Sequence, residues 1–214
     1  MKGKNVAKKV VAQVANEEIV AKKQERIARA AGELFSIKGY HHTTMRDISR
    51  ASGINLAYLY QYVSSKDDIL YLFYMHLYKQ WSPIFQSLEE ESQDPVDQFK
   101  KFLRSILELI HKLHNELVTM YGDCRYLERE SLHSVLAAES ETIKSLEKLI
   151  IRGIGKGVFR TKDPCITANI IQYLVTFEAL RGWNFRDRVT FTRTVELVQE
   201  FVLRALGVGD KKDK

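Results

Sequence analysis

Apolar residues recur at helical spacing along almost the whole chain. Between residues 26 and 40 they follow the i, i+3, i+4, i+7, i+8 pattern of one helix face, at Ile27, Ala30, Ala31, Leu34 and Phe35. Gly39 predicts the end of this helix, because glycine most easily adopts the left-handed conformation that follows a last turn. No internal repeat or pair of alternating strands interrupts the pattern. The sequence therefore predicts an all-α fold.

Capping motifs divide this pattern into about nine helices. Thr44 with Asp47, and Ser65 with Asp68, have the spacing of a capping box, and Asn55 is a further N-cap candidate. Asp94 and Asp163 each precede a proline, which fits the first helical position because its missing N–H costs nothing there. The predicted helices span about 26–39, 45–52, 56–62, 66–90, 95–117, 118–130, 131–153, 163–183 and 187–206.

The composition is that of an ordinary globular protein of 214 residues, with 45% hydrophobic and 28% charged residues. No apolar run approaches the roughly 18 residues that a membrane-spanning helix needs. Cys124 and Cys165 form no CxxC unit, which argues against a disulfide framework and a cysteine zinc site. The basic N-terminus has too short an apolar patch for a signal peptide. These features predict a cytoplasmic protein.

The excess of positive over negative charge is confined to the first part of the chain. Residues 1–80 hold 13 Lys and Arg against 7 Asp and Glu, whereas residues 81–214 hold 20 of each kind. A basic segment on a neutral body predicts a polyanionic partner, with nucleic acid first and an anionic membrane surface second.

The basic segment also contains a predicted helix–turn–helix. The short helices 45–52 and 56–62 are joined by a tight turn at Gly53 and follow a longer helix. Four tyrosines occur within or just after the second short helix, more than so small a core can bury. Their hydroxyl groups and apolar rings suit contacts with phosphates, sugars and thymine methyl groups.

These residues resemble a known family. The N-terminal signature of the TetR family of transcriptional regulators is similar to residues 24–77, above all to TTMRDISRASGINLAYLYQYVSSKDDIL. One departure is Val63, where the family usually has an aromatic residue. The rest of the chain resembles the family in length and helical architecture. The resemblance implies an N-terminal three-helix DNA-binding domain and a C-terminal helical domain for ligand binding and dimerisation.

The resemblance also implies roles for single residues. Thr44 and Arg46 would contact phosphates or a base edge at the start of the second helix. The residues implied to lie at the major groove are Asn55, Leu56, Ala57, Tyr58 and Gln61. Those implied to hold phosphates are Tyr60, Tyr62 and Lys66, the last at a helix N-terminus. Among all of these, only Arg46, Asn55 and Gln61 have side chains suited to bidentate base reading.

An N-terminal arm, residues 1–21, is a further candidate for DNA contact. Lysines in and just after the arm would follow phosphates or enter the minor groove, and the alternative is an arm without specific contact or one that extends the first helix. These lysines are Lys2, Lys4, Lys8, Lys9, Lys22 and Lys23.

The body of the chain is longer than a linker needs to be, which predicts a second task. A two-fold symmetric DNA site needs a dimer with recognition helices about 34–36 Å apart. In the resembled family the last two long helices form that dimer. The interface candidates are Ile166, Ile170, Leu174, Arg181, Val195, Val198, Phe201 and Val202, although some of them must instead face the core of their own subunit.

The middle helices are expected to enclose a small hydrophobic effector. The candidate lining residues are His76, Trp81, Phe102, Ile106, Ile110, Met120, Tyr121, Arg125, Tyr126, Tyr173 and Phe177. Ordinary core packing is the alternative for each of them. The stretch RYLERES and the later GIGKGVFRTKDP are loosely similar to relatives that sense acyl-CoA thioesters, which favours an acyl-CoA or fatty acid; a hydrophobic drug is the second choice.

No catalytic or metal-binding motif is present in the sequence. His111 and His114 have no further ligands at a fixed spacing, and the glycines near Gly153 follow a helix rather than a strand. We therefore predict no catalytic residue, metal or cofactor. The alternatives are an architectural DNA-binding protein without an effector and, more remotely, an enzyme.

These inferences predict four regions, the arm at 1–21, the DNA-binding domain at 22–66, the effector and dimerisation domain at 67–208 and a disordered tail at 209–214. The predicted function is a homodimeric, ligand-responsive regulator, most simply a repressor that a small molecule releases from a palindromic operator.

Overall fold

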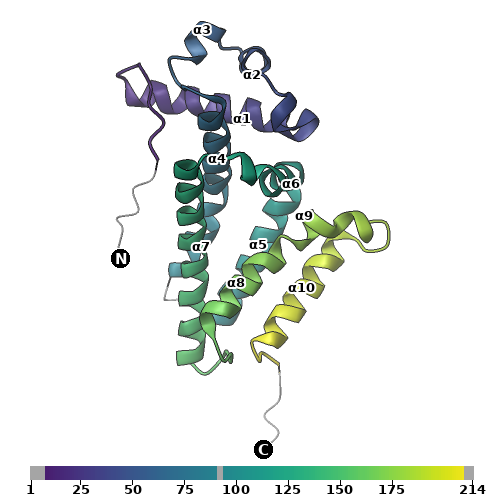
Figure 1. Cartoon of the computed structure of the whole chain (residues 1–214). Helices are drawn as coiled ribbons and strands as arrows, with labels where there is room; N and C mark the ends of the chain where they lie inside the picture. The colour runs from purple at the N-terminus through teal and green to yellow at the C-terminus, as the bar shows by residue number, and fades with distance from the viewer. Residues whose placement is uncertain (1–7, 91–93, 210–214) are drawn as a thin grey trace, which may run out of the picture. The chain divides into compact units, whose positions relative to one another are not determined.

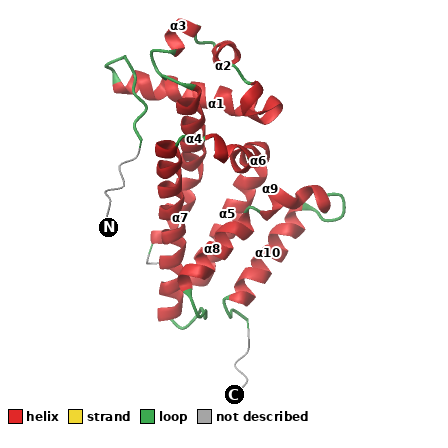
Figure 2. Ribbon diagram, viewed as in Figure 1, coloured by secondary structure: helices red, strands yellow, loops and turns green. Residues whose placement is uncertain are grey.

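The computed structural model describes residues 8–90 and 94–209, and over these residues the chain is all-helical, as the sequence predicts (Figures 1 and 2). No strand occurs in the described part of the chain. The α-helices are α1 (Glu17–His42), α2 (Met45–Ser52), α3 (Leu56–Leu59), α4 (Lys66–Gln86), α5 (Pro95–Lys112), α6 (His114–Asp123), α7 (Arg129–Gly155), α8 (Pro164–Val175), α9 (Phe177–Arg181) and α10 (Phe191–Ala205). Three short 3-10 helices accompany them, at Ser87–Glu89, Cys124–Tyr126 and Gly182–Asn184.

The predicted N-caps are confirmed. Thr44 and Asp47 form a complete capping box at α2, and the Asn55 side chain accepts a hydrogen bond from the Ala57 amide at α3. Ser65 accepts from the Asp68 amide at 3.0 Å, which caps α4. The aspartates before Pro95 and Pro164 accept from first-turn amides of α5 and α8.

Several helix ends differ from those predicted. The segment 95–117 breaks at Leu113, whose backbone leaves the helical region, and α6 begins at the next residue. The segment 163–183 breaks at Thr176, where the hydroxyl donates to the Tyr173 carbonyl at 2.7 Å and the chain turns. Helix α4 ends at Gln86 rather than near residue 90, three residues after Pro83. Proline has no N–H for the helical hydrogen-bond ladder, which accounts for an end soon after it.

The chain folds into two compact units. The first comprises residues up to Gln80 together with Asn115–Glu139. Its core lies where α1 crosses the first half of α4, and the Phe35 and Phe73 rings meet edge-on there at 6.0 Å. A Cβ on Gly32 would lie 2.6 Å from the Phe73 ring, so this close crossing requires glycine in α1. These contacts form the platform on which α2 and α3 rest.

The second unit comprises Trp81–His114 together with the residues from Ser140 onward. Helix α5 packs against α8, α9 and α10, and its buried face includes Phe99, Phe102 and Ile106. The centre of the Phe99 ring lies 6.0 Å from that of Phe102 and 5.6 Å from that of Phe159. The unit therefore has an aromatic core of its own.

The predicted domain boundaries at residues 21, 66 and 208 remain predictions, since compactness divides the chain in a different way. Helices α4 and α7 each run from one unit into the other. None of the described helices is long and apolar enough to cross a membrane.

Candidate nucleic-acid interface

The start of α2 is fixed by a network around Asp47. Its carboxylate accepts hydrogen bonds from the Thr44 amide at 2.9 Å, from the Thr44 hydroxyl at 2.6 Å and from Lys38 of α1 at 2.7 Å. The Lys38 hydrogen bond, followed by the two from Thr44, holds the pKa of Asp47 far below its usual value. Because Lys38 belongs to α1, the same contact fixes α2 against the platform helix.

The turn between α2 and α3 depends on Gly53. This residue has a φ of +61° and ends α2 with its amide bonded to the Arg50 and Ser49 carbonyls. A Cβ at Gly53 would lie 2.5 Å from the Arg26 guanidinium of α1. The Ser49 hydroxyl donates to the Ile54 carbonyl at 2.7 Å, and Ile54 is buried. The turn is therefore held on both sides, which fixes the direction in which α3 leaves it.

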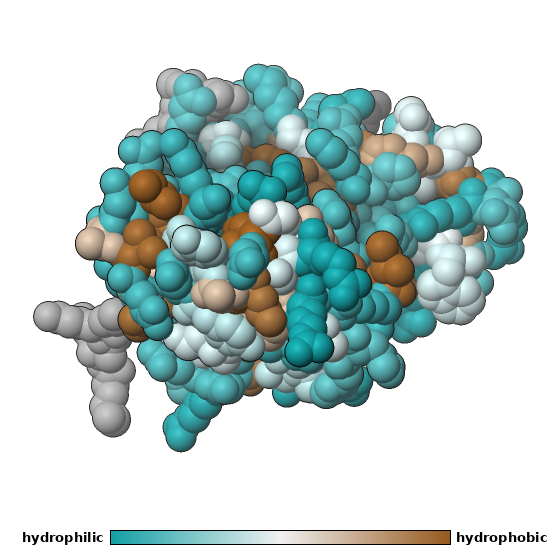
Figure 3. Space-filling model, turned by 90° about the horizontal axis from the view of Figure 1, so that it is seen from above, coloured by the Kyte–Doolittle hydropathy of each residue, from teal (hydrophilic) through white to brown (hydrophobic). Residues whose placement is uncertain are grey.

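Helix α3 buries one side and presents the other to solvent. Leu59 is fully buried, whereas Tyr58 is 59% exposed and Tyr60 is 46% exposed. Asn55 and Ala57 are also exposed. The face of the molecule on which α2 and α3 lie is mainly hydrophilic, with separate apolar side chains among the polar ones (Figure 3). These side chains are accessible to a partner, and their contacts with DNA remain predictions.

Thr44 and Asn55 already use polar atoms of their side chains as N-caps. The Thr44 hydroxyl both donates to and accepts from Asp47. The Asn55 side-chain oxygen accepts from the Ala57 amide at 2.9 Å, so bidentate reading of an adenine by Asn55 would have to share that oxygen with the cap. Gln61 is therefore the stronger candidate for base reading, whereas Arg46 remains a candidate for either a phosphate or a base edge.

Lys66 and Tyr62 have roles within the fold that the sequence did not indicate. The Lys66 ammonium donates to the carbonyls of Tyr40 at 2.9 Å and Thr43 at 3.2 Å, and it lies 4.1 Å from the centre of the Tyr40 ring. Burial lowers the pKa of Lys66 below its usual value. Tyr62 is only 7% exposed. Their predicted phosphate contacts remain untested. Lys66 joins the start of α4 to the end of α1, and the Tyr62 side chain is buried within the first unit.

Most of the described lysines in residues 8–80 form ion pairs, whereas the arginines there do not. Each of five lysines in the first unit forms an ion pair with a carboxylate, namely Lys8, Lys9, Lys22, Lys38 and Lys79. Among the described residues, no ion pair is formed by the exposed Arg26, Arg29, Arg46 and Arg50. Of the arm lysines, Lys2 and Lys4 lie outside the described residues. Within the described part of the chain, the positive charge of α1 and α2 that no carboxylate pairs is therefore on these arginines and on Lys23; of these residues, the sequence had indicated Arg46 and Lys23.

The effector candidates divide between the two units. His76, Met120, Tyr121, Arg125 and Tyr126 belong to the first. Burial lowers the pKa of His76, and its Nδ1 is buried without a hydrogen-bond partner in the described part of the chain. The Met120 carbonyl accepts from the Tyr74 hydroxyl.

Tyr126 lies at the C-terminal end of α1 rather than in an enclosed pocket. Its ring stacks on Tyr40 with centroids 5.4 Å apart, and Arg125 lies 4.8 Å from the Tyr126 centroid. Tyr126 is thus placed to connect the 3-10 helix after α6 with α1, and Arg125 packs on the Tyr126 ring.

In the second unit, Trp81, Phe102, Ile106 and Ile110 are buried core residues. Tyr173 is 64% exposed, and its prediction as a pocket-lining residue is not supported by that position. Phe177 stacks on Phe185 at 5.3 Å, and both line an apolar hollow of about 330 Å³ between α8, α9 and α10. A shared effector cavity for all the candidates remains a prediction.

The interface candidates also divide in two. Ile166, Ile170 and Phe201 are more than half exposed, as an interface needs before assembly. Val195, Val198 and Val202 are at most 5% exposed, so they pack within their own unit, and this burial does not support their assignment to the interface. Arg181 is exposed and Leu174 lines the apolar hollow. The sequence analysis omitted the exposed Leu197 and Trp183.

No described residues form a group of three or more His, Cys, Asp and Glu side chains able to hold a metal ion. His111 instead contacts the buried Glu178, which also accepts from Arg186 at 2.9 Å. Cys124 and Cys165 are both exposed and free.

Two family models match most of this architecture. The model described as "Bacterial regulatory proteins, tetR family" matches residues 27–71, which contain α2, α3 and most of α1. The model described as "Tetracyclin repressor-like, C-terminal domain" matches residues 92–177.

Individual relatives are similar to this chain over most of its length. The HTH-type transcriptional regulator HbdR of Aromatoleum sp. (strain CIB) is 25% identical over 190 residues, covering 89% of this chain and 83% of HbdR. The TetR family regulator PfmR of Thermus thermophilus has a similar structure, with a TM-score of 0.71, 24% identity and coverage of 87% of this chain and 100% of PfmR.

A second similar structure is that of a complex with an acyl-CoA and DNA. AibR, in complex with isovaleryl coenzyme A and operator DNA, has a TM-score of 0.69 and 19% identity, covering 86% of this chain and 97% of AibR. The helix–turn–helix with its exposed α3 face, the helical body and both family matches agree, and the chain belongs to the TetR family of transcriptional regulators.

Proposed function

We propose that this chain binds a palindromic operator as a homodimer, with α3 of each subunit in a major groove, and that a small hydrophobic effector releases it. Regulators of the TetR family bind operator DNA, dimerise and are typically ligand-responsive repressors. For this chain, the palindromic operator, the hydrophobic effector and repression rather than activation are what we propose. Because the partner is DNA, the proposed place of action is the cytoplasm.

The observation that carries the proposal is the outward face of α3 beside unpaired arginines. Tyr58 and Gln61 on or just after α3 provide an aromatic ring and an amide, and Arg46 provides a guanidinium free of ion pairs among the described residues. Phosphate contacts give affinity, whereas amide and guanidinium contacts with base edges give specificity. The face contains both kinds of group.

Footprinting tests the DNA part of the proposal. The purified protein should protect two half-sites whose centres are about one turn of the duplex apart, about 34–36 Å. Gln61→Ala should change base preference at one position in each half-site, while the Ser82→Ala control in the second unit should not. Binding that depends on salt but shows no preference for any sequence would instead favour an architectural DNA-binding protein.

The dimer part rests on exposed apolar side chains. Ile166, Ile170 and Tyr173 follow one another at helical spacing along α8 and are all more than half exposed, and so is Phe201 of α10. A contiguous exposed apolar patch of this kind marks an interaction site in a globular protein. The exposed side of α8 and α10 is therefore the proposed contact between the two subunits.

For the effector we propose an acyl-CoA or a fatty acid. The support is the apolar character of the body, the unpartnered buried Nδ1 of His76 and the likeness to AibR, which was crystallised with isovaleryl coenzyme A. A hydrophobic drug is the alternative, because an apolar cavity with few polar groups suits it equally.

Thermal denaturation separates these effectors. Octanoyl-CoA should raise the melting temperature by several degrees at a concentration far above its Kd, because a ligand that binds only the folded state stabilises it. Coenzyme A, octanoate and ethidium are the comparison probes. A shift with ethidium alone would support the drug; no shift with either octanoyl-CoA or octanoate would exclude the acyl proposal.

A further inference from the structure

The segment of residues 8–16 runs without helical structure from the start of α4 to the start of α1, where Asn16 accepts from the Ile19 amide as the N-cap. We call this segment the strap. The sequence analysis treated it as part of a basic arm that reaches for DNA. In the structure, the hydrogen bonds and ion pairs of the strap join it to other residues of the first unit.

Lys8 anchors the first end of the strap, and every polar group of the residue is bonded. Its ammonium lies 2.9 Å from carboxylate oxygens of both Asp67 and Asp68 and donates to the Ser131 hydroxyl at 2.8 Å. Its amide donates to the Ser134 hydroxyl at 2.8 Å. Its carbonyl accepts from the Tyr71 hydroxyl at 2.9 Å.

This anchor is largely buried, which makes its loss costly. The side chain of Lys8 is 12% exposed, and those of Asp67 and Asp68 are 6% and 10% exposed. Asp67 also accepts from the Glu128 amide at 2.8 Å, so the first turns of α4 and α7 meet at Lys8. Removing one partner of a buried pair leaves an uncompensated charge.

The other end of the strap is hydrogen-bonded to the chain just after α3, the proposed recognition helix. The Gln13 amide donates to the carbonyl of Gln61, just past the end of α3, at 2.8 Å. Gln24 of α1 donates to the carbonyl of Tyr62 at 3.0 Å and to that of Val10 at 3.5 Å. The strap thus connects the α4–α7 junction directly with Gln61 and, through Gln24, with Tyr62, both shortly after the end of α3.

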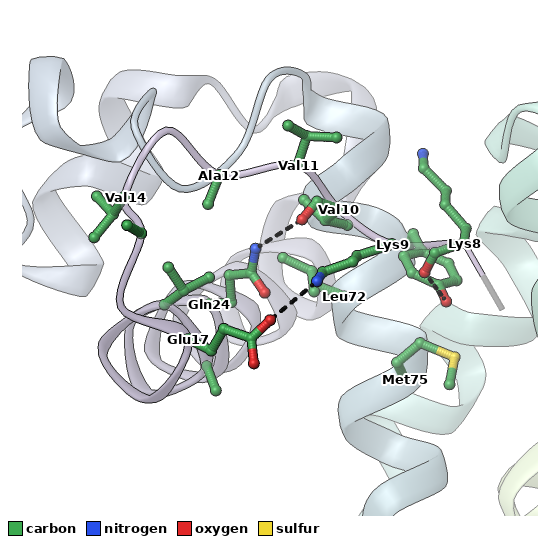
Figure 4. Close-up of a pocket in the computed structure, with 14 residues that line it drawn as sticks. Lys8, Lys9, Val10, Val11, Ala12, Val14, Glu17, Gln24, Leu72 and Met75 are labelled. Atoms are coloured by element: carbon green, nitrogen blue, oxygen red, sulfur yellow. Dashed lines mark hydrogen bonds and ion pairs between the residues drawn. The ribbon is translucent and has the colours of Figure 1, made fainter.

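Between these ends the strap stands away from the helices. A cavity of about 810 Å³ lies under it, walled by the strap, α1 and α4, and the close-up shows Val14 and Gln24 around this space (Figure 4). Val11 is 73% exposed, although Val10 is buried. Polar bonds at its ends therefore position the strap more than continuous packing along its length.

We propose that the strap positions the recognition helix for DNA, with Lys8 as the positioning residue. This inference rests on the proposed function. Lys8 acts from within the unit and contacts no phosphate, because its ammonium is already bonded to three side chains. A change at the α4–α7 junction reaches the end of α3 through Lys8, the strap and the Gln13–Gln61 hydrogen bond.

The test compares two adjacent lysines by titrating operator DNA at several salt concentrations. Lys8→Met removes the anchor, whereas Lys9→Met removes the same charge from a side chain that is 84% exposed and pairs only with Glu17 among the described residues. We expect Lys8→Met to weaken operator binding by about tenfold with an unchanged salt slope. Lys9→Met should stay within about twofold of the wild type.

The salt slope separates the possible roles of Lys8. A phosphate contact would lower the slope by about one unit when it is removed, and that result would overturn the proposal. Unchanged affinity of a variant that circular dichroism shows to be folded would also overturn it. If the wild-type protein binds no operator, that result contradicts the proposed function and not the positioning role of the strap.

Tyr71→Phe is the second variant, to be used if Lys8→Met does not fold. It keeps the ion pairs of Lys8 with Asp67 and Asp68. It removes only the hydroxyl that donates to the Lys8 carbonyl. We expect a smaller loss of affinity in the same direction, together with faster hydrogen exchange at the Gln13 amide. Exchange and affinity that both match the wild type would contradict a role for the strap.

Discussion

At the scale of single residues, Gly53 shows how the turn of the helix–turn–helix depends on one side chain. Its φ of +61° is strained for any residue with a Cβ, and a Cβ would also meet Arg26. We expect Gly53→Ala to lower the free energy of unfolding by about 1–2 kcal/mol. Urea denaturation measures this, with Gly122→Ala as the control, because Gly122 lies within α6 with no atom near its Cβ position. Equal stability of the two variants would contradict the role of Gly53.

The cluster of Lys8 with Asp67 predicts how stability depends on pH. Burial alone would lower the pKa of Lys8, but the hydrogen bonds and charges of Asp67 and Asp68 outweigh it and raise that pKa above its usual value. Burial alone would raise the pKa of Asp67, but hydrogen bonds from Ser131, the Glu128 amide and Lys8 lower it.

The two shifts act at opposite ends of the pH range. The contribution of Asp67 is present above the usual carboxyl pKa of about 4 and is lost as pH falls through its lower folded value. The contribution of Lys8 is present below its usual pKa of about 10.4 and is lost as pH rises through its raised folded value. Asp67→Asn should therefore lose stability at pH 7 and less of it at pH 3. Melting temperatures from pH 3 to 7 test this, with Asp187→Asn expected to follow the wild-type profile.

Residue-scale features near in sequence were predictable, and those distant in sequence were not. Thr44 and Asp47 are three positions apart, and Asn55 is two from the amide that it caps, so spacing alone identified both caps. Lys8 and Ser131 are 123 positions apart. Only the fold brings them together, and a lysine in a basic N-terminal segment gives no sign that its partners are internal.

At the scale of helices, α10 shows where periodicity reaches its limit. The helix has apolar residues on two sides, and the sequence analysis placed Val195, Val198 and Val202 at a dimer interface. The structure buries those three, whereas Phe201, which the sequence analysis also listed, and Leu197, which it did not, are exposed. Helical spacing identifies which residues share a face, but it does not indicate which of two apolar faces belongs to the subunit's own core.

The exposed faces of α8 and α10 give a prediction about assembly. Ile170→Glu should shift the protein from dimer to monomer at micromolar concentration, because a carboxylate buried in an apolar contact loses its hydration without a partner. The control is Ile37→Glu, an 83% exposed position on α1 in the other unit. Size-exclusion chromatography with light scattering distinguishes the two states. A dimeric Ile170→Glu variant would place the interface on another surface.

At the scale of the whole molecule, the excess of positive charge lies in the first 80 residues of the chain. The excess of positive charge in residues 1–80 was evident from the sequence, but the sequence could not show which cations are neutralised within the fold. The structure pairs five lysines of the first unit with carboxylates. In α1 and α2 the arginines and Lys23 form no carboxylate pair among the described residues, and the proposed long-range attraction for DNA depends on them.

Arg46 is the arginine at which this distribution is best tested. Arg46→Gln should weaken binding to operator and to random duplex alike and reduce the salt slope by about one unit, because one phosphate contact releases about one counterion. Arg204→Gln is the matched control, since Arg204 lies in the second unit and pairs with Glu200 at 2.7 Å. Loss of affinity for the operator alone, with the slope kept, would instead assign Arg46 to base reading. If Arg204→Gln lowered the slope as much as Arg46→Gln, DNA would not be drawn mainly to the α1–α3 face.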